Sequence, residues 1–116
     1  MIILNQKPEI IHRQMLKHML SAFLLWLISK KPVHGYELIK KIEKDGGFHV
    51  ITASKLYPIL KVLTKQGLIS QKKESQGQRV RKVYHITEKG SSVLKQIKKC
   101  LCVSALKRQF LREMTQ

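Results

Sequence analysis

The residues with the clearest chemical character in this sequence are cationic and hydroxyl side chains that could bind phosphate. Arg79 and Arg81 are two positions apart in a run that alternates like a β-strand, so they share one side of it. Lys61 and Lys65 are four positions apart and share one side of a predicted helix. Ser54 lies near the start of the same helix, where its hydroxyl could bond a phosphate or a base edge. These residue types and spacings indicate a polyanionic ligand.

The overall charge points the same way. The 116 residues include 23 Lys and Arg against 7 Asp and Glu, a formal net charge of +16. Such an imbalance favours association with polyanions, of which nucleic acid is the first candidate and an anionic membrane surface the second. The length and the 43% hydrophobic content predict a single domain over residues 1–116.

Acidic and metal-binding side chains are too scattered for a catalytic or metal site. The 7 acidic residues form no evident carboxylate pair, and no phosphate-cradling glycine loop occurs. The 5 histidines show no compact ligand spacing, except for His12 and His18, which are six apart and poorly aligned on a helix. Cys100 and Cys102 would point about 200° apart on a helix, which disfavours a disulfide and a shared metal. We therefore expect no enzyme activity, no cofactor and no metal.

The longest apolar run, MLSAFLLWLI at residues 19–28, does not predict a membrane span. It is well short of the roughly 20 residues needed to cross a bilayer. Its position after eighteen residues and before SKKP does not fit a secretory signal. A buried helix is the better interpretation, so we expect a cytoplasmic protein without a membrane partner.

Apolar spacing and helix stops predict three helices before Gly67. The first covers residues 9–29, with a break left open near Leu20, and ends before Pro32. The second lies within HGYELIKKIEKDGG and ends at its two glycines. The third begins at Thr52, whose hydroxyl can cap the first turn, and ends at Gly67. Its buried face carries Leu56, Ile59, Leu60 and Leu63, and its outward face carries Ser54, Tyr57, Pro58, Lys61 and Lys65.

Pro58 lies inside this third predicted helix. A proline there removes one backbone hydrogen bond and costs about 3 kcal/mol. The helical period places Pro58 on the outward side, where water can reach the backbone. That placement lowers the cost without removing it.

After Gly67 the apolar pattern changes from helical to alternating. LISQKKESQGQRVRKVYHIT holds two strand-forming runs joined by SQGQ, where Gly77 can take the positive φ of a hairpin. From Thr87, one continuous helix about 40 Å long is predicted to run towards Met114. A small core cannot cover all its apolar residues, which suggests contact with another subunit. The expected contact residues are Val93, Ile97, Leu101, Leu106 and Phe110.

Two short helices followed by a basic hairpin are the order of elements in a winged helix-turn-helix. The segments PVHGYELIKKIEK, TASKLYPILKVLTKQGLI and RVRKVYHITEKG resemble, in order and with natural spacing, the characteristic segments of the PadR family of transcriptional regulators. The short chain resembles the smaller subfamily. The expected fold is mainly α (α+β), with a winged helix-turn-helix over residues 9–87, a two-stranded wing, and a long dimerisation helix over residues 88–114.

The resemblance implies a homodimeric repressor that binds a near-palindromic operator in double-stranded DNA. The final helix and the N-terminal helix would join the two subunits. A hydrophobic pocket at that interface would suit a small-molecule effector, as in drug-sensing and phenol-sensing relatives. The sequence does not name the effector or the operator.

Individual residues are carried over from the same resemblance. Tyr36 and Tyr57 match aromatic positions near the phosphate backbone, although either could instead be a half-buried packing residue. Lys55 stands where the family commonly has a small hydroxyl residue, and it adds charge to the first turn of its helix. The complete expected DNA-binding set is Tyr36, Thr52, Ser54, Lys55, Tyr57, Lys61, Lys65, Gln78, Arg79 and Arg81.

Two other functional classes stay open. A winged-helix module can mainly bind another protein, because a fold alone does not fix function. A cationic chain can also bind RNA or DNA without sequence preference. The 6% aromatic content argues against base stacking on single strands.

Overall fold

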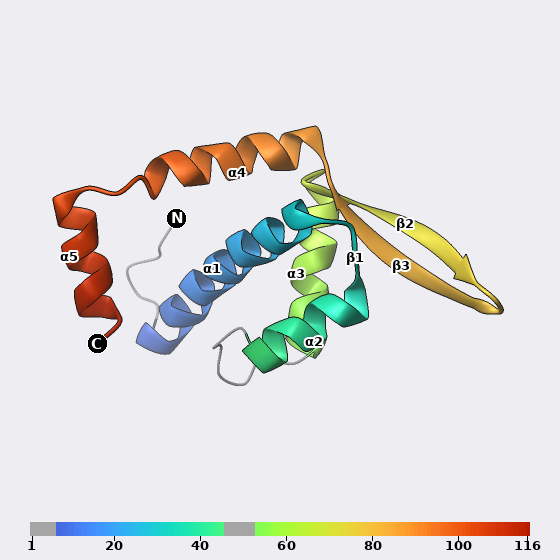
Figure 1. Cartoon of the computed structure of the whole chain (residues 1–116). Coiled ribbons are helices and arrows are strands. Elements are labelled where there is room, and N and C mark those ends of the chain that lie inside the picture. The colour runs from blue at the N-terminus through green and yellow to red at the C-terminus, as the bar shows by residue number, and fades with distance from the viewer. Residues whose placement is uncertain (1–6, 46–52) are drawn as a thin grey trace.

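The computed structural model describes residues 7–45 and 53–116, which form a mainly helical protein with one small antiparallel sheet. The elements in chain order are α1 (Pro8–Lys30), β1 (Val33–His34), α2 (Gly35–Asp45), α3 (Ala53–Lys65), β2 (Ile69–Gln76), β3 (Arg79–Ile86), α4 (Glu88–Cys100) and α5 (Ala105–Met114). This order confirms the predicted fold class, a winged helix-turn-helix whose wing is the β2–β3 hairpin (Figure 1).

Helix α1 contains the apolar run that the sequence assigned to a buried helix. It continues through Leu20, so the break left open there does not occur. Pro8 occupies its first turn, where a missing backbone N–H is tolerated. None of the described helices combines the length and the apolar character that crossing a membrane would require. The buried residues of α1 are Leu20, Leu24, Leu25, Leu27 and Ile28.

The hydrophobic core lies where α1, α2, α3 and the base of the sheet meet. Leu24 of α1 and Leu56 and Leu60 of α3 have no exposed surface. The predicted buried face of α3 is therefore confirmed, together with Ile59 and Leu63. Burial of each such side chain contributes roughly 1.5–3 kcal/mol. The same packing fixes which side of α3 faces outward.

Gly67 ends α3, as predicted. Its φ is +78°, and the amide of Leu68 donates to the carbonyl of Leu63 at 3.0 Å. This is the Schellman arrangement, in which a left-handed glycine turns the chain back at a helix end. The described part of α3 starts at Ala53. The N-cap expected at Thr52 lies outside the described residues.

The wing is an antiparallel hairpin in which Gln76 is opposite Arg79. Gly77, with φ of +62°, is the first of the two connecting residues, as the hairpin prediction required. The two-residue strand β1 was not predicted. It pairs with β3, with His34 opposite Val83, and gives a three-stranded sheet of order β1-β3-β2. The wing is therefore attached along β3 to the segment that begins α2.

Thr87 and Gly90 fix the start of α4 against the turn that ends α3. The Thr87 hydroxyl accepts from the amide of Gly90 at 3.0 Å and lies 2.6 Å from the carbonyl oxygen of Gly67. The Thr87 amide donates to the carbonyl of Leu68 at 3.2 Å. A Cβ added to Gly90 would lie 2.0 Å from that same carbonyl oxygen. Only glycine lets α4 approach so closely.

The prediction of one C-terminal helix over residues 88–114 is wrong. The chain forms α4 and α5, separated by residues 101–104. The Leu101 amide donates to the carbonyl of Ile97 and ends α4. Ser104 is extended, and its hydroxyl accepts from the amide of Lys107 at 3.2 Å. Serine is favoured at an N-cap over a helix interior, so this local cap wins over helix continuation.

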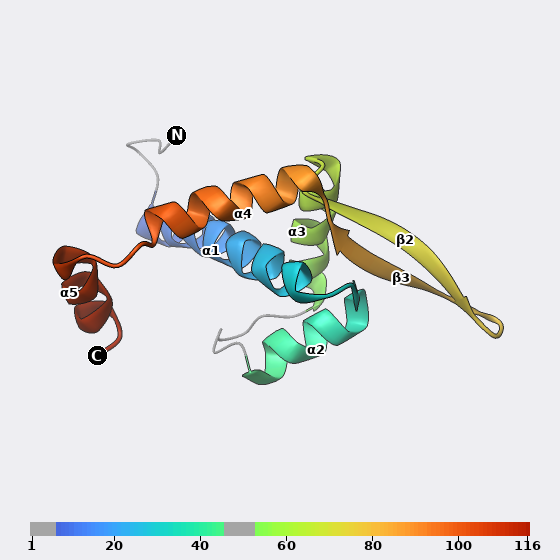
Figure 2. The ribbon, with the colours of Figure 1, turned by 45° about the horizontal axis from the view of Figure 1, so that its top comes forward.

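The two ends of the molecule carry different elements. Both views show α4 running along α1, the wing extending from one end and α5 standing off the other (Figures 1 and 2). No residue of α5 is buried. Cys100 and Cys102, at and just after the end of α4, are free and exposed. The apolar side of α5 therefore faces solvent in the single chain.

Candidate nucleic-acid interface

The outer face of α3 carries five of the side chains predicted to meet DNA. All five are exposed, because they lie on the side of the helix away from the buried leucines. Tyr57 keeps 46% of its surface exposed, so it is not simply a packing residue. The predicted outward placement is confirmed, whereas contact with DNA stays a prediction. The five are Ser54, Lys55, Tyr57, Lys61 and Lys65.

Pro58 is exposed within α3, as the helical period predicted. It borders a groove of about 380 Å³ that is also lined by α1 and α4, with His18 and Ile97 among its residues. Val62, one turn further along α3, lines the same groove. Pro58 therefore lies at the edge of the outer face of α3, where that face meets the neighbouring helices.

Arg79 and Arg81 lie on one face of the wing, as their spacing predicted. The pairing register places Arg81 opposite Glu74 on β2. Gln78 is exposed in the connection at the wing tip, next to Arg79. The wing tip therefore presents polar and cationic groups to solvent.

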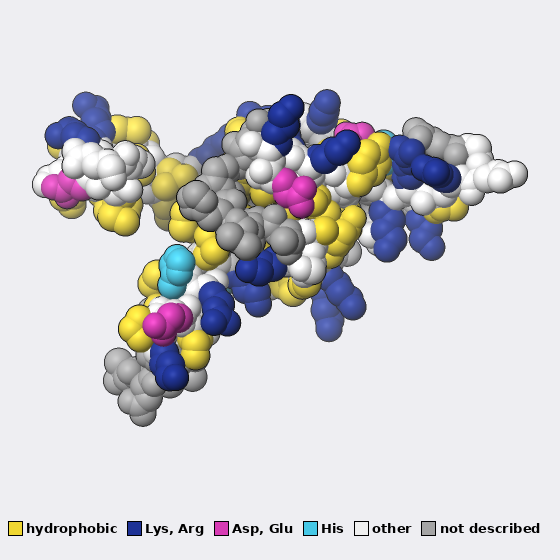
Figure 3. All heavy atoms as spheres, turned by 90° about the horizontal axis from the view of Figure 1, so that it is seen from below, with side chains coloured by type: hydrophobic (Ala, Val, Ile, Leu, Met, Phe, Trp, Pro, Cys, Tyr) yellow, Lys and Arg dark blue, Asp and Glu magenta, His cyan; other side chains and the backbone are white. Residues whose placement is uncertain are grey.

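Three lysines of the wing were missed as candidate residues. Lys73 and Lys82 are exposed cross-strand partners, and like charges directly opposite each other destabilise a hairpin. A phosphate between them would relieve this repulsion. Lys72 is exposed beside them, on the other face of β2. Seen from below, Lys and Arg side chains lie along the wing behind its tip (Figure 3). The two successive lysines in QKKES were the signal in the sequence.

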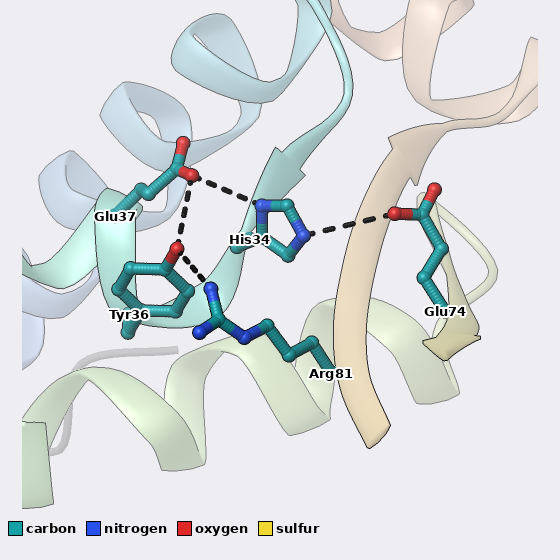
Figure 4. A network of polar contacts seen from close by, with 5 residues as sticks. All are labelled: His34, Tyr36, Glu37, Glu74 and Arg81. Atoms are coloured by element: carbon teal, nitrogen blue, oxygen red, sulfur yellow. Dashed lines mark hydrogen bonds and ion pairs between the residues drawn. The ribbon is translucent and has the colours of Figure 1, made fainter. Parts of the chain in front are cut away.

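Polar contacts connect the wing with the start of α2 (Figure 4). Nη1 of Arg81 donates to the hydroxyl oxygen of Tyr36 at 2.6 Å, and its guanidinium carbon lies 5.0 Å from the centre of the Tyr36 ring. His34 Nδ1 lies 3.0 Å from Oε1 of Glu37, and His34 Nε2 lies 3.7 Å from Oε2 of Glu74. The sequence did not indicate the contacts of Arg81 and Glu74, because these residues are far from Tyr36 and His34 in the chain.

A buried tyrosine supports this junction from the inside. Tyr84 is 4% exposed, and its hydroxyl oxygen accepts from the Gln71 side chain at 3.2 Å. Burial raises the pKa of Tyr84 above its ordinary value of 10.0, because it disfavours the charged phenolate. A Cβ at Gly35 would lie 3.1 Å from Cε2 of Tyr84. The glycine of the HGY segment therefore leaves room for this ring.

The residues predicted for subunit contact divide into two groups. Val93 packs partly against the core of its own chain, and Ile97 is half-buried and lines the groove. Leu101, Leu106 and Phe110 are exposed, with 67%, 76% and 59% of their surfaces accessible. Uncovered apolar surface in the single chain therefore lies just after α4 and along α5, and α1 exposes Met15 and Met19 as well.

Comparison with known proteins identifies relatives that match most of the chain. Residues 24–96 match the profile of the transcriptional regulator PadR-like family. A PadR-like transcriptional regulator from Bacillus cereus is 33% identical; the match covers 89% of this chain and 97% of that chain, with a TM-score of 0.71. A Streptococcus transcriptional regulator is 26% identical over 89% of this chain and 98% of that chain, with a TM-score of 0.65.

One further relative was solved with its ligand. Bacillus subtilis PadR in complex with operator DNA is 30% identical, with a TM-score of 0.61, over 67% of this chain and 45% of that chain. No match was found among curated proteins. The family profile spans more than half of the chain, and the Bacillus cereus relative matches nearly all of it. With its helix-turn-helix, cationic wing and three characteristic segments, this chain belongs to the PadR-like family of transcriptional regulators.

Proposed function

We propose that this protein is a homodimeric repressor that binds a near-palindromic operator in double-stranded DNA. The outer face of α3 reads the major groove, and the wing contacts the flanking backbone. The observation that carries the proposal is the cationic surface that α3 and the wing present to solvent, in a chain 30% identical to a PadR solved on operator DNA. The protein acts in the cytoplasm, where its DNA lies.

The exposed apolar surface supports the dimer. Three large apolar side chains stay more than half exposed in the single chain: Leu101, Leu106 and Phe110. Exposed apolar patches of this kind are typical of surfaces that bind another protein. A two-fold dimer also matches a near-palindromic site, because each subunit then reads one half-site.

A small-molecule effector is part of the proposal. The groove between α1, α3 and α4 has a volume within the range of ligand pockets. Pro58 and Val62 line it from α3, so an occupant there would touch the DNA-reading helix directly. The effector would release the protein from DNA if it bound more tightly to a conformation in which α3 does not fit the operator.

Selection of duplexes from a random-sequence library tests the main proposal. A repressor enriches one two-fold symmetric sequence. A protein-interaction module would bind DNA weakly and without sequence preference, and a non-specific cationic protein would bind tightly without enriching any sequence.

Neutralising the two wing arginines should weaken binding to operator and random duplexes alike. Arg79→Gln with Arg81→Gln removes two cations near the wing tip, so the salt dependence should flatten by up to about two phosphates. Fluorescence anisotropy over a salt series measures both the affinity and the slope. Lys98→Gln with Lys99→Gln on α4 removes the same charge away from the wing and serves as the control. An unchanged salt dependence would show that these arginines do not contact DNA.

Pro58→Ala should leave the melting temperature unchanged or raise it, because a helical hydrogen bond is restored. Operator affinity should nevertheless fall by about three- to tenfold, comparable to losing one good contact. The reason is that a proline inside a helix bends it, so we expect Pro58 to set the direction of the first turn of α3, which carries Ser54 and Lys55. Random-duplex binding should change less. Val62→Ala, on the same side of α3, controls for lost side-chain contacts, and a lower melting temperature with full operator affinity would make Pro58 a packing residue.

A further inference from the structure

The guanidinium of Arg81 is held by a tyrosine 45 residues earlier in the chain. Nη1 donates to the hydroxyl of Tyr36 at 2.6 Å, and the guanidinium stacks on the ring at 5.0 Å. Arginine is a long, flexible side chain, and these two contacts restrict both its position and its plane. Arg81 therefore makes these two contacts in the chain without DNA.

Tyr36 is itself held in place by a carboxylate. Its hydroxyl donates to Oε1 of Glu37 at 3.4 Å, and the same oxygen lies 3.0 Å from Nδ1 of His34. A carboxylate only accepts hydrogen bonds, so Nδ1 of His34 carries a proton in this contact. The tyrosine oxygen thus accepts from an arginine and donates to a carboxylate at the same time.

The second strand of the wing meets the same group of residues. Nε2 of His34 is buried, has no hydrogen-bond partner, and faces Oε2 of Glu74 at 3.7 Å. Glu74 belongs to β2, whereas Arg81 belongs to β3. The hydrogen bond from Arg81 therefore joins β3 to Tyr36, and Glu74 of β2 lies beside His34, just before α2 (Figure 4).

This geometry disfavours a direct contact between Tyr36 and a phosphate. A phosphate oxygen needs the hydroxyl proton, which Tyr36 directs to Glu37. The negative charge of Glu37 next to the hydroxyl would also repel a phosphate. The exposed hydroxyl is better placed to hold Arg81 than to bind the DNA backbone.

We propose that Tyr36 is a positioning residue, which holds the Arg81 guanidinium while Glu37 and His34 hold Tyr36, so that the wing meets DNA at a set angle to α3. The inference rests on the proposed DNA-binding function and deepens it. It changes the role of Tyr36 from a DNA contact to a support for one. It also makes the geometry of the wing depend on residues at the start of α2.

A double-mutant cycle between Tyr36→Phe and Arg81→Gln tests the proposal. The probes are the duplex that the wild type enriches from a random-sequence library and the unenriched pool. Tyr36→Phe keeps the ring but removes the hydroxyl, and it should lower affinity for the enriched duplex by about three- to tenfold. In the Arg81→Gln background the same change should have little effect, because no guanidinium remains to be held.

Arg81→Lys separates charge from position. Lysine keeps the cation but lacks the planar fork that stacks on Tyr36 and bonds its hydroxyl. Arg81→Lys should therefore keep the salt dependence of DNA binding but lower the affinity for the enriched duplex. In the Arg81→Lys background, Tyr36→Phe should cause little further loss of affinity. The melting temperature of each variant should stay within a few degrees of the wild type, since Tyr36 is 44% exposed.

Three outcomes would overturn the inference. Losses that add in the double mutant would mean that Tyr36 contacts DNA by itself. A higher DNA affinity for Tyr36→Phe would mean that Tyr36 keeps Arg81 away from DNA. An unchanged affinity would mean that Tyr36 neither positions Arg81 nor contacts DNA. If the wild type enriches no sequence, the specific repressor proposal fails instead, and the same cycle on the pooled duplexes still decides the role of Tyr36.

Discussion

Gly90→Ala should destabilise the protein by about 2–4 kcal/mol, although alanine is normally the better helix former by about 1 kcal/mol. The added Cβ would lie 2.0 Å from the backbone carbonyl oxygen of Leu68 and 2.9 Å from Cγ1 of Ile86. A carbonyl in the turn after α3 cannot move away as a flexible side chain can. The start of α4 would have to shift instead, which would weaken the Thr87 cap and its bonds to the same turn.

Thermal unfolding by circular dichroism measures this effect, and we expect the melting temperature to fall by roughly 10 °C. Ser92→Ala is the matched control, because it places alanine at an exposed site two residues later in α4. That change should leave the melting temperature the same or raise it slightly. A Gly90→Ala protein that melts at or above the wild-type temperature would show that α4 does not pack against Leu68 as described.

Leu106→Glu with Phe110→Glu should convert the dimer to monomers without unfolding the chain. The two side chains are one turn apart on α5 and are 76% and 59% exposed, so the monomer does not depend on them. In a dimer interface they would be buried, and two added carboxylates there would lack partners. Operator affinity should fall on the order of 100-fold, because the two half-sites would no longer be bound as a unit.

Sedimentation at micromolar concentration measures the assembly, and circular dichroism verifies the fold. Gln109→Glu with Gln116→Glu adds the same charge to the C-terminal segment without touching the apolar pair. That control should remain dimeric. A double variant that stays dimeric would show that α5 does not form the interface. A wild type that is already monomeric under these conditions would contradict the dimer proposal itself.

The parts of the fold that the sequence predicted are those with strong local causes. The buried face of α3 follows from four apolar residues at helical spacing. The ends of α3 and of the first wing strand follow from Gly67 and Gly77, whose positive φ values other residues rarely adopt. Residues 24–96, which contain most of the three PadR-like segments, match the family profile.

The errors came from competition between local signals of similar strength. Apolar spacing from Val93 to Met114 fits one helix, yet Ser104 caps a new helix and separates α4 from α5. Helix continuation and N-capping differ by only about 1 kcal/mol, so composition alone did not decide between them. The two-residue strand β1 is too short for any periodic pattern, and only its pairing with β3 defines it.

The sequence by itself determined the charge, the order of the helices and strands from α2 to β3, and the outward placement of the α3 cations. Each of these depends on residue type or on neighbours within a few positions along the chain. The tertiary structure alone decided that Arg81 meets Tyr36 and that His34 lies between Glu37 and Glu74. Those contacts require β3 to fold back beside the start of α2, and the closing of such a long loop leaves no periodic trace in the sequence.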